Sequence, residues 1–349
     1  MVYRFRFLKQ WTADARQPAT SRSESSAADR RAYRRLLLRR ESARILKEAL
    51  ITLVGAGVAI SVVLALVPDA VTDDSFFGRI GCNLKTFVGL LTLQYNEPTV
   101  YENDPVLGVL FNRGMKSFTL ILGALAITMV LGISTGLLLA RKPHNSLVKA
   151  WAWIISAISA MPVLVLGILL IVLASAFFGI SPFLEILDKA NPLDRPSLGE
   201  YLLVYLLPMA TLAFGDGMLH DVIRAVNLET RRLLEQDYLR AARARNVSLW
   251  PHLRKGLTAP VIAVLAGKVT YLIGGSVVVE WIFAWQGLAY QVMFVLTRAP
   301  RDIPFILAAT VLFVGIIVLV NVISEIITLR SDPRLARKPS GQPVIQEVS

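Results

Sequence analysis

Long apolar stretches recur along this chain and are separated by segments that carry most of its charge. A hydrocarbon core of about 30 Å requires about 20 residues of helix. Six stretches satisfy this requirement, and they lie at residues 49–67, 118–140, 151–178, 201–219, 258–281 and 303–329. The pattern therefore predicts an all-α membrane protein with about six transmembrane helices.

Two of the six stretches contain residues that are unusual inside a membrane helix. The third contains Pro162, and the fourth contains Pro208 and Asp216. Proline is tolerated in lipid when neighbouring groups satisfy the backbone groups that it frees. We therefore expect each of the two stretches to cross the membrane as one helix.

Lysine and arginine are divided unequally between the two sides of these spans. If the N-terminus lies inside, 28 of the 37 basic residues fall in the inside segments 1–47, 141–149, 220–257 and 330–349. Only 8 fall in the outside segments. Because cytoplasmic loops carry the excess of positive charge, both termini are predicted to be cytoplasmic.

The basic ends of the chain set the predicted domain limits. Residues 1–47 form a cytoplasmic tail, in which residues 30–47 suit a basic helix that lies on anionic lipid. A solvated tail that only sets the orientation is the alternative. Residues 48–335 form the transmembrane domain, and residues 336–349 form a cytoplasmic tail.

Composition and charge narrow the function classes. Hydrophobic residues make up 54% of the chain, and the net charge is +12. In a soluble protein such charge would suggest nucleic acid, but here the basic residues flank apolar spans, so the expected partner is the lipid membrane and no nucleic acid. Cys82 is the single cysteine, and the histidines are scattered, so we expect no metal site and no catalytic residue.

Charged residues inside the spans are candidates for function. Lys268 lies about 15 Å into the fifth span at 1.5 Å per residue. A lysine there costs at least about 2.5–3.5 kcal/mol, so we expect it to face a water-filled path or a partner subunit. A direct pair with Asp216 is not assured. Glu280 lies about 33 Å along the same helix, which predicts a place at the outer interface. Trp285 follows it and could belong to an interfacial aromatic belt.

The loop at residues 220–257 is predicted to fold as short helices. One covers residues 221–235 and extends the fourth span, and a second covers residues 236–245. Asn246 is suited to a left-handed helix end, and Ser248 is suited to cap a further turn before a fifth span that begins near Pro260. No G-x-x-x-x-G-K-[ST] motif for nucleotide binding is visible.

Four motifs occur in order in the second half of the chain. They are DYLRAARARN at 237–246, HLRKGLTAP at 252–260, GGSVVVE at 274–280 with IFAWQGL at 282–288, and SDPR at 331–334. The first resembles the EAA coupling loop of ABC-importer permeases. The whole series is similar to the dipeptide/oligopeptide/nickel branch of that family. The chain departs from the pattern at Asn246, which replaces a glycine, at Gln286, which replaces a proline, and in a shorter connector before His252.

The resemblance implies a type I ABC-importer permease in the bacterial inner membrane. Its implied partners are a second homologous permease, two ATP-binding cassette subunits and an external solute-binding protein. The chain would itself be no enzyme and bind no cofactor, because ATP and Mg²⁺ belong to the ATPases. It would move a small solute, foremost a peptide, by alternating access.

The resemblance also implies roles for individual residues. The residues expected to couple to the ATPases are Asp237, Tyr238, Leu239, Arg240, Ala241, Ala242, Arg243 and Asn246. The residues expected in the translocation path or its gate are Lys268, Asp216, Gly275, Glu280 and Trp285.

Two other functions compete with this interpretation. A self-contained secondary transporter or channel predicts inverted repeats and broken spans with ligands at the midplane. A membrane enzyme or scaffold would require a cluster of His, Asp and Glu at one face. The sequence gives no convincing sign of a repeat or of such a cluster.

Overall fold

The computed structural model confirms the predicted all-α class. It describes residues 19–66, 75–95, 97–100, 103–179, 197–298 and 301–331. Within these ranges it describes side chains from Ser42 onward, except those of Lys255, Ala259 and residues 328–331. The regular elements in this part of the chain are helices, accompanied by one isolated bridge between Pro98 and Pro105. Of the N-terminal tail predicted at residues 1–47, residues 19–47 form the first part of helix Ala19–Ala65, and residues 1–18 lie outside the described residues, as does the tail predicted at residues 336–349.

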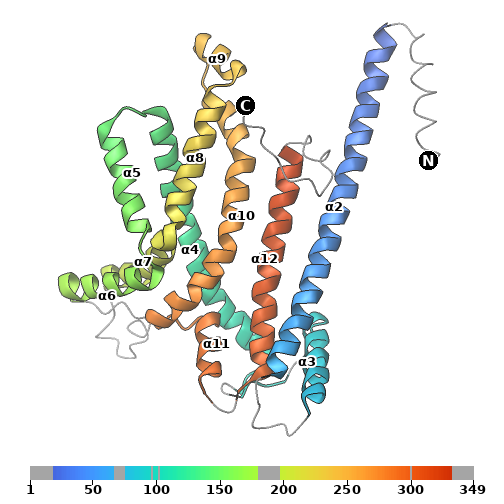
Figure 1. Ribbon diagram of the computed structural model, residues 1–349, viewed down its shortest axis with the longest axis vertical. Coiled ribbons are helices and arrows are strands. Elements are labelled where there is room, and N and C mark those ends of the chain that lie inside the picture. Colours follow the sequence, from blue (N-terminus) through green and yellow to red (C-terminus); the bar gives the residue numbers. More distant parts are fainter. Residues whose placement is uncertain are drawn as a thin grey trace, which may run out of the picture.

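Figure 1 shows the helices as one bundle with short segments at its ends. The long helices are α2 (Ala19–Ala65), α4 (Val106–Arg141), α10 (Trp250–Ile282) and α12 (Ile303–Ser331). The shorter helices are α3 (Phe76–Leu91), α5 (Ser146–Ser159), α6 (Val163–Phe178), α7 (Leu198–Phe214), α8 (Met218–Leu234), α9 (Asp237–Ala244) and α11 (Leu288–Leu296).

Five helical stretches in the described chain are long and apolar enough to cross a membrane, and a bent pair makes a sixth. The five are Ser42–Ala65, Val106–Arg141, Leu198–Leu234, Pro260–Ile282 and Ile303–Ile327. They correspond to the first, second, fourth, fifth and sixth predicted spans. The prediction of about six spans is therefore confirmed.

The third predicted span, 151–178, is not one continuous helix. It consists of α5 and α6, which are bent by 103° at a short break. Pro162 ends the break and directly precedes α6. Proline lacks an N–H and disfavours helical backbone in the residue before it, so the helix stops before Pro162. The expectation of a single helix here was wrong, because Pro162 breaks the helix instead of being absorbed by it.

The fourth span continues into the segment that was predicted to be a cytoplasmic loop. The predicted helix 221–235 is confirmed as α8, which follows α7 after the turn Gly215–Gly217. Val222 and Val226 of α8 pack against the segment of α10 around Val264. The first turns of α8 therefore lie beside the start of the fifth span, and the loop proper begins later than residue 220.

Small residues of α4 let α4 and α8 approach closely. A Cβ atom placed on Gly136 would lie 2.7 Å from the Cβ of Val226 and 2.9 Å from the carbonyl oxygen of Ile223. Gly132 faces Val222 in the same way. Such contacts are typical of helix packing in membranes, where small residues allow close backbone approach.

The two ends of the bundle carry different short helices. In Figure 1, α9 and the connection between α4 and α5 lie at one end, and α3 and α11 lie at the other. The predicted topology with both termini inside requires the α4–α5 connection and α9 to share an end, and they do. We refer below to the α9 end and the α11 end.

Candidate functional site

The helix α9 has the boundaries that its sequence predicts. Gln236 precedes it with an extended backbone, and Asn246 follows it with φ of 53°. The Asn246 N–H donates to the Arg243 carbonyl, and the Val247 N–H donates to the Ala242 carbonyl, both at 3.0 Å. This is the left-handed helix end for which asparagine is suited, so the prediction for residues 236–246 is confirmed.

One buried side chain attaches α9 to the rest of the bundle. Leu239 is 1% exposed and packs with Leu253 and Leu257 at the start of α10. Leu233, in the last turn of α8, completes this cluster. The ring of Tyr238 also meets His252 edge-on at 6.4 Å. Because its apolar side is anchored in this way, α9 is fixed to both α8 and α10.

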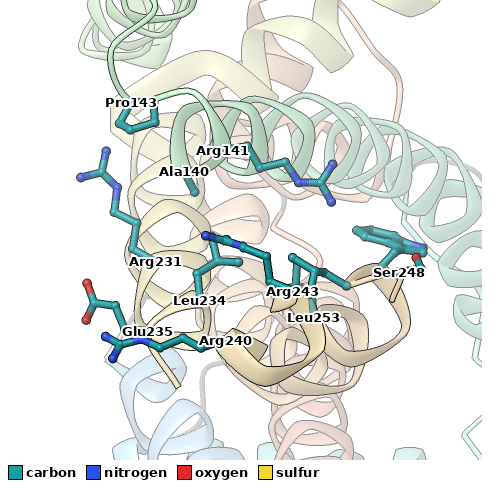
Figure 2. Close-up of a pocket in the computed structure, with 12 residues that line it drawn as sticks. Ala140, Arg141, Pro143, Arg231, Leu234, Glu235, Arg240, Arg243, Ser248 and Leu253 are labelled. Atoms are coloured by element: carbon teal, nitrogen blue, oxygen red, sulfur yellow. The ribbon is translucent and has the colours of Figure 1, made fainter. Parts of the chain in front are cut away.

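Beside this anchor, α9 borders a hollow, which we call the basic pocket. It has a volume of about 840 Å³ and lies between α9 and the ends of α4, α8 and α10 (Figure 2). Its charged lining residues are Arg141, Arg231, Glu235, Arg240 and Arg243. Within the described chain, the guanidinium groups of Arg240 and Arg243 form no ion pair. The pocket therefore offers positive charge to an anionic group.

The connector after α9 differs in detail from its prediction. Ser248 was expected to cap a separate turn, but α10 begins at Trp250 with Leu249 at its N-cap and no side-chain cap. Pro251 stands in the first turn, where proline is tolerated. The helix then runs through Pro260 without interruption. Ser248 instead lines the basic pocket, so the capping prediction was wrong.

Lys268 has a charged partner within its own chain. Its Nζ pairs with Oδ2 of Asp221 on α8, and the two side chains are 23% and 51% exposed. Asp216 does not take part in this pair, because its Oδ2 accepts a hydrogen bond of 2.6 Å from the hydroxyl of Tyr271. Hydropathy had placed Asp221 in the loop, so its pairing with Lys268 was not predicted.

Glu280 is buried, and its expected place at an exposed interface was wrong. Its exposed fraction is 0%. The Ser117 hydroxyl donates to its Oε1 at 2.6 Å, and the Tyr290 N–H donates to its Oε2 at 2.8 Å. The Ser117 oxygen in turn accepts a hydrogen bond from the Leu288 N–H at 2.7 Å. The chain folds back after α10, and the first turn of α11 covers the carboxylate.

Gly287 makes this fold-back possible. A Cβ atom there would lie 2.5 Å from both the Oε2 of Glu280 and the Oγ of Ser117. No side chain fits at that distance, so any larger residue would separate α11 from Glu280. The sequence contained a signal for this site, because Gly287 lies in the IFAWQGL motif, but spacing alone did not reveal its role.

The two other predicted gate residues are also packed inside the bundle. Trp285 is 2% exposed, donates from Nε1 to the Lys116 carbonyl at 3.1 Å and meets Tyr205 edge-on at 5.2 Å. It does not belong to an interfacial belt. Gly275 faces Leu212 of α7, whose Cδ1 would lie 2.9 Å from an added Cβ. The predicted path residues therefore separate into a partly exposed group around Lys268 and a buried group around Glu280.

No cluster of three or more His, Cys, Asp or Glu residues that could hold a metal ion occurs in the described chain. The polar residues that it brings together are the arginines of the basic pocket, the Lys268–Asp221 pair, the Asp216–Tyr271 pair and the Glu280 cluster. These groups offer charge and hydrogen bonds for binding and positioning.

Comparison with known proteins agrees with this arrangement. The family described as "Binding-protein-dependent transport system inner membrane component" matches residues 132–337. The oligopeptide transport system permease protein AppB of Bacillus subtilis is 29% identical over 276 residues, which cover 75% of this chain and 84% of the relative. The nickel import system permease protein NikB of Staphylococcus aureus is 27% identical over 260 residues, with coverages of 73% and 72%. A putative peptide permease protein of Brucella suis is 25% identical over 237 residues, with coverages of 67% and 72%.

The family match covers more than half of the chain. It includes the last ten residues of α4, all of α5 to α9, the Lys268–Asp221 pair and the Glu280 side chain. The chain therefore belongs to the family of binding-protein-dependent inner membrane components, as a multi-pass permease subunit of an ABC importer that is similar to peptide and nickel permeases.

Proposed function

We propose that this chain, together with a second homologous permease, forms the membrane path of a peptide importer that is driven by two ATPase subunits docked at α9. An external solute-binding protein delivers the solute, and ATP with Mg²⁺ is bound by the ATPases. The observation that carries the proposal is α9 itself: a short helix anchored by Leu239 that presents Arg240 and Arg243 beside the basic pocket.

The anchoring of α9 supports its role in coupling. Leu239 is packed against Leu253 and Leu257 of α10 and Leu233 of α8. Packed interfaces move as rigid bodies rather than deforming continuously. A displacement of α9 by an ATPase would therefore move α8 and α10 with it, and both helices continue into the membrane. The residues Asp237–Arg243 and Asn246 are the proposed coupling segment.

The path and gate residues take different places in this proposal. Lys268 and Asp221 are partly exposed at membrane depth, where ionisable groups face water or a partner. We place them along the solute path. Glu280, Trp285 and Gly275 are buried, and we assign them to the framework that holds α11 at the gate.

Peptide is the proposed solute because relatives are named as oligopeptide and putative peptide permeases. A nickel chelate is the second candidate, on the name of the Staphylococcus relative. Selectivity would reside mainly in the solute-binding protein, so the ligand that copurifies with that partner, identified by mass spectrometry, distinguishes the two.

The bend between α5 and α6 would also fit a self-contained secondary transporter, in which broken spans are typical, but the family match makes the chain one component of a binding-protein-dependent system. The two functions differ in their energy source. Purification of the intact assembly from membranes, followed by uptake of a labelled peptide mixture into liposomes with and without ATP, separates them. The importer requires bound ATPases and ATP. An assembly without ATPases whose uptake persists without ATP overturns the proposal.

A charge reversal tests the role of α9 in the same assay. We expect Arg243→Glu to abolish copurification of the ATPases and ATP-driven uptake, because it reverses a charge at the proposed contact. Lys149→Glu is the matched control, since Lys149 is an exposed residue of α5 at the same end of the bundle. Equal loss in both variants, or full uptake in Arg243→Glu, would contradict docking at α9.

A further inference from the structure

Two helix breaks lie against each other. One separates α5 from α6, and the other, at Gly215–Gly217, separates α7 from α8. The N–H of Asp216 donates to the carbonyl of Met161 at 2.9 Å, so the breaks are joined by a direct backbone hydrogen bond. A Cβ atom on Gly215 would lie 3.0 Å from the Cα of Val163. The two breaks are therefore packed as one unit.

The carboxylate of Asp216 holds this unit together. Its Oδ1 accepts a hydrogen bond of 3.0 Å from the N–H of Val163, the first residue of α6. The first N–H groups of a helix have no partner within it, and Pro162 gives α6 no side-chain cap. Asp216 therefore caps α6 from a different helix. Its Oδ2 accepts the Tyr271 hydroxyl at 2.6 Å, which adds α10 to the same side chain.

The backbone at Asp216 is held in an uncommon conformation. Its φ is 50°, and Gly217 follows with φ of 77°. A residue other than glycine costs about 1–2 kcal/mol in this left-handed region. Strained backbone of this kind persists only where surrounding contacts hold it, and it is concentrated in functional and switch regions. Here the contacts are the hydrogen bonds to Met161, Val163 and Tyr271.

The helix α8 connects this point with α9. It begins at Met218, two residues after Asp216, and ends at Leu234, three residues before α9 begins. Its end is fixed to α9 through Leu233 and Leu239. The segment from Asp216 to Leu234 therefore contacts α9 at one end and α6 and α10 at the other.

We propose that Asp216 is a positioning residue that passes a displacement of α9 and α8 on to α6 and α10, and that its hydrogen bond with Tyr271 is needed to keep transport coupled to ATP hydrolysis. The inference rests on the proposed importer function. It extends that function by identifying Asp216 as the residue through which a movement of α8 reaches both α6 and α10. A brace that only stabilises the fold would make the same contacts but would leave the coupling ratio unchanged when weakened.

The test removes the hydroxyl oxygen of Tyr271, which donates the hydrogen bond to Asp216. Tyr271→Phe deletes the hydroxyl and keeps the ring, and it leaves the contact between Asp216 and Val163 in place. Tyr201→Phe is the matched control, because Tyr201 is a partly exposed tyrosine of α7 at 40% exposure. Both variants are assembled with the ATPases in liposomes. ATP hydrolysis and uptake of labelled trialanine are then measured per assembled complex in the presence of the solute-binding protein.

We expect Tyr271→Phe to hydrolyse ATP at the wild-type rate and to import about tenfold less solute per ATP, the factor that corresponds to losing one hydrogen bond to a charged group. Tyr201→Phe keeps the wild-type ratio. An unchanged ratio in Tyr271→Phe overturns the inference, even if less complex assembles, because the values are normalised to assembled complex.

A second variant tests the carboxylate itself. Asp216→Asn keeps the size of the side chain and one acceptor oxygen but cannot accept both hydrogen bonds through oxygen. It is expected to lower the amount of solute imported per ATP, and a wild-type ratio would again overturn the inference. Failure of the proposed function looks different, because the wild-type assembly would then show no ATP-dependent uptake at all.

Discussion

The charged side chains at the α11 end and the α9 end of the bundle differ in their burial and in their hydrogen-bond partners. At the α11 end, Glu280 is fully buried and accepts hydrogen bonds from Ser117 and from the backbone of Tyr290. At the α9 end, Arg240 and Arg243 are exposed and, in the part of the chain described, form no ion pair. The carboxylate at the α11 end is satisfied by hydrogen bonds within the chain, whereas the guanidinium groups at the α9 end are available to a binding partner.

This difference separates what stabilises the fold from what can be recognised by a partner. A buried carboxylate is costly unless hydrogen bonds replace its hydration, so substitutions of Glu280 should lower the free energy of unfolding. An exposed arginine costs little to hold and little to remove. Substitutions of the exposed arginines of α9 should therefore weaken binding of a partner and have small effects on the free energy of unfolding.

The largest expected effect follows from removal of the buried carboxylate. Glu280→Ala leaves the Ser117 hydroxyl and the Tyr290 N–H without their partner and opens a cavity. We expect the free energy of unfolding to fall by about 2–6 kcal/mol, because each of the two buried donors left without a partner costs about 1–3 kcal/mol. Thermal unfolding of the protein purified in detergent measures this. Glu325→Ala, at an exposed residue of α12, should be near neutral, and equal effects in the two variants would contradict the comparison.

The α4–α8 contact connects the two ends and should be the next most sensitive region. Gly136→Ala would place a Cβ atom 2.9 Å from the Ile223 carbonyl oxygen, so the helices must separate. Overpacking of this kind costs about 1–3 kcal/mol. Gly108→Ala is the matched control on the same helix, because nothing lies within 4 Å of its added Cβ. The same unfolding assay applies, and a neutral Gly136→Ala would show that α4 and α8 are not closely packed.

The end of α9 should respond by a smaller amount. Asn246 has φ of 53°, and alanine in this region costs about 1–2 kcal/mol. We expect Asn246→Ala to increase hydrogen exchange of the amides in residues 237–246, whereas Asn246→Gly should preserve their protection. Faster exchange in the glycine variant than in the alanine variant would contradict the assigned helix end.

The smallest effect on stability is expected for the Lys268–Asp221 pair. Both side chains are partly exposed, and such pairs contribute about 0–1 kcal/mol. Lys268→Met should therefore assemble and unfold almost as the wild type does. If the pair lines the solute path, uptake per assembled complex should nevertheless fall. Unchanged uptake in Lys268→Met would remove Lys268 from the path.

Local sequence signals were sufficient for α9 and for most of the spans. The segment between Gln236 and Asn246 consists of helix-forming residues, and Asn246 is suited to a left-handed helix end. The structure confirms both the helix and its end. Long apolar stretches likewise predicted the positions of five spans, one of which is interrupted by the turn Gly215–Gly217. These features depend on neighbouring residues, and for that reason the sequence alone was enough.

Features that depend on distant residues could not be predicted in this way. The break before α6 is stabilised by Asp216, which lies 53 positions after Val163. The depth of Glu280 was calculated along the helix axis, but its burial depends on α11 folding back over Gly287. The partner of Lys268 was missed because α8 continues beside α10 past the end of the apolar stretch.

The account depends most directly on contact between α9 and an ATPase subunit. A photoreactive cross-linker placed at Ala241, an exposed residue of α9, tests this contact in membranes that carry the complete importer. A probe at Phe77, which is 80% exposed on α3 at the opposite end, is the control. The account predicts that Ala241 is cross-linked to an ATPase subunit and Phe77 is not. Absence of an ATPase adduct at Ala241 in membranes that import solute with ATP would contradict it.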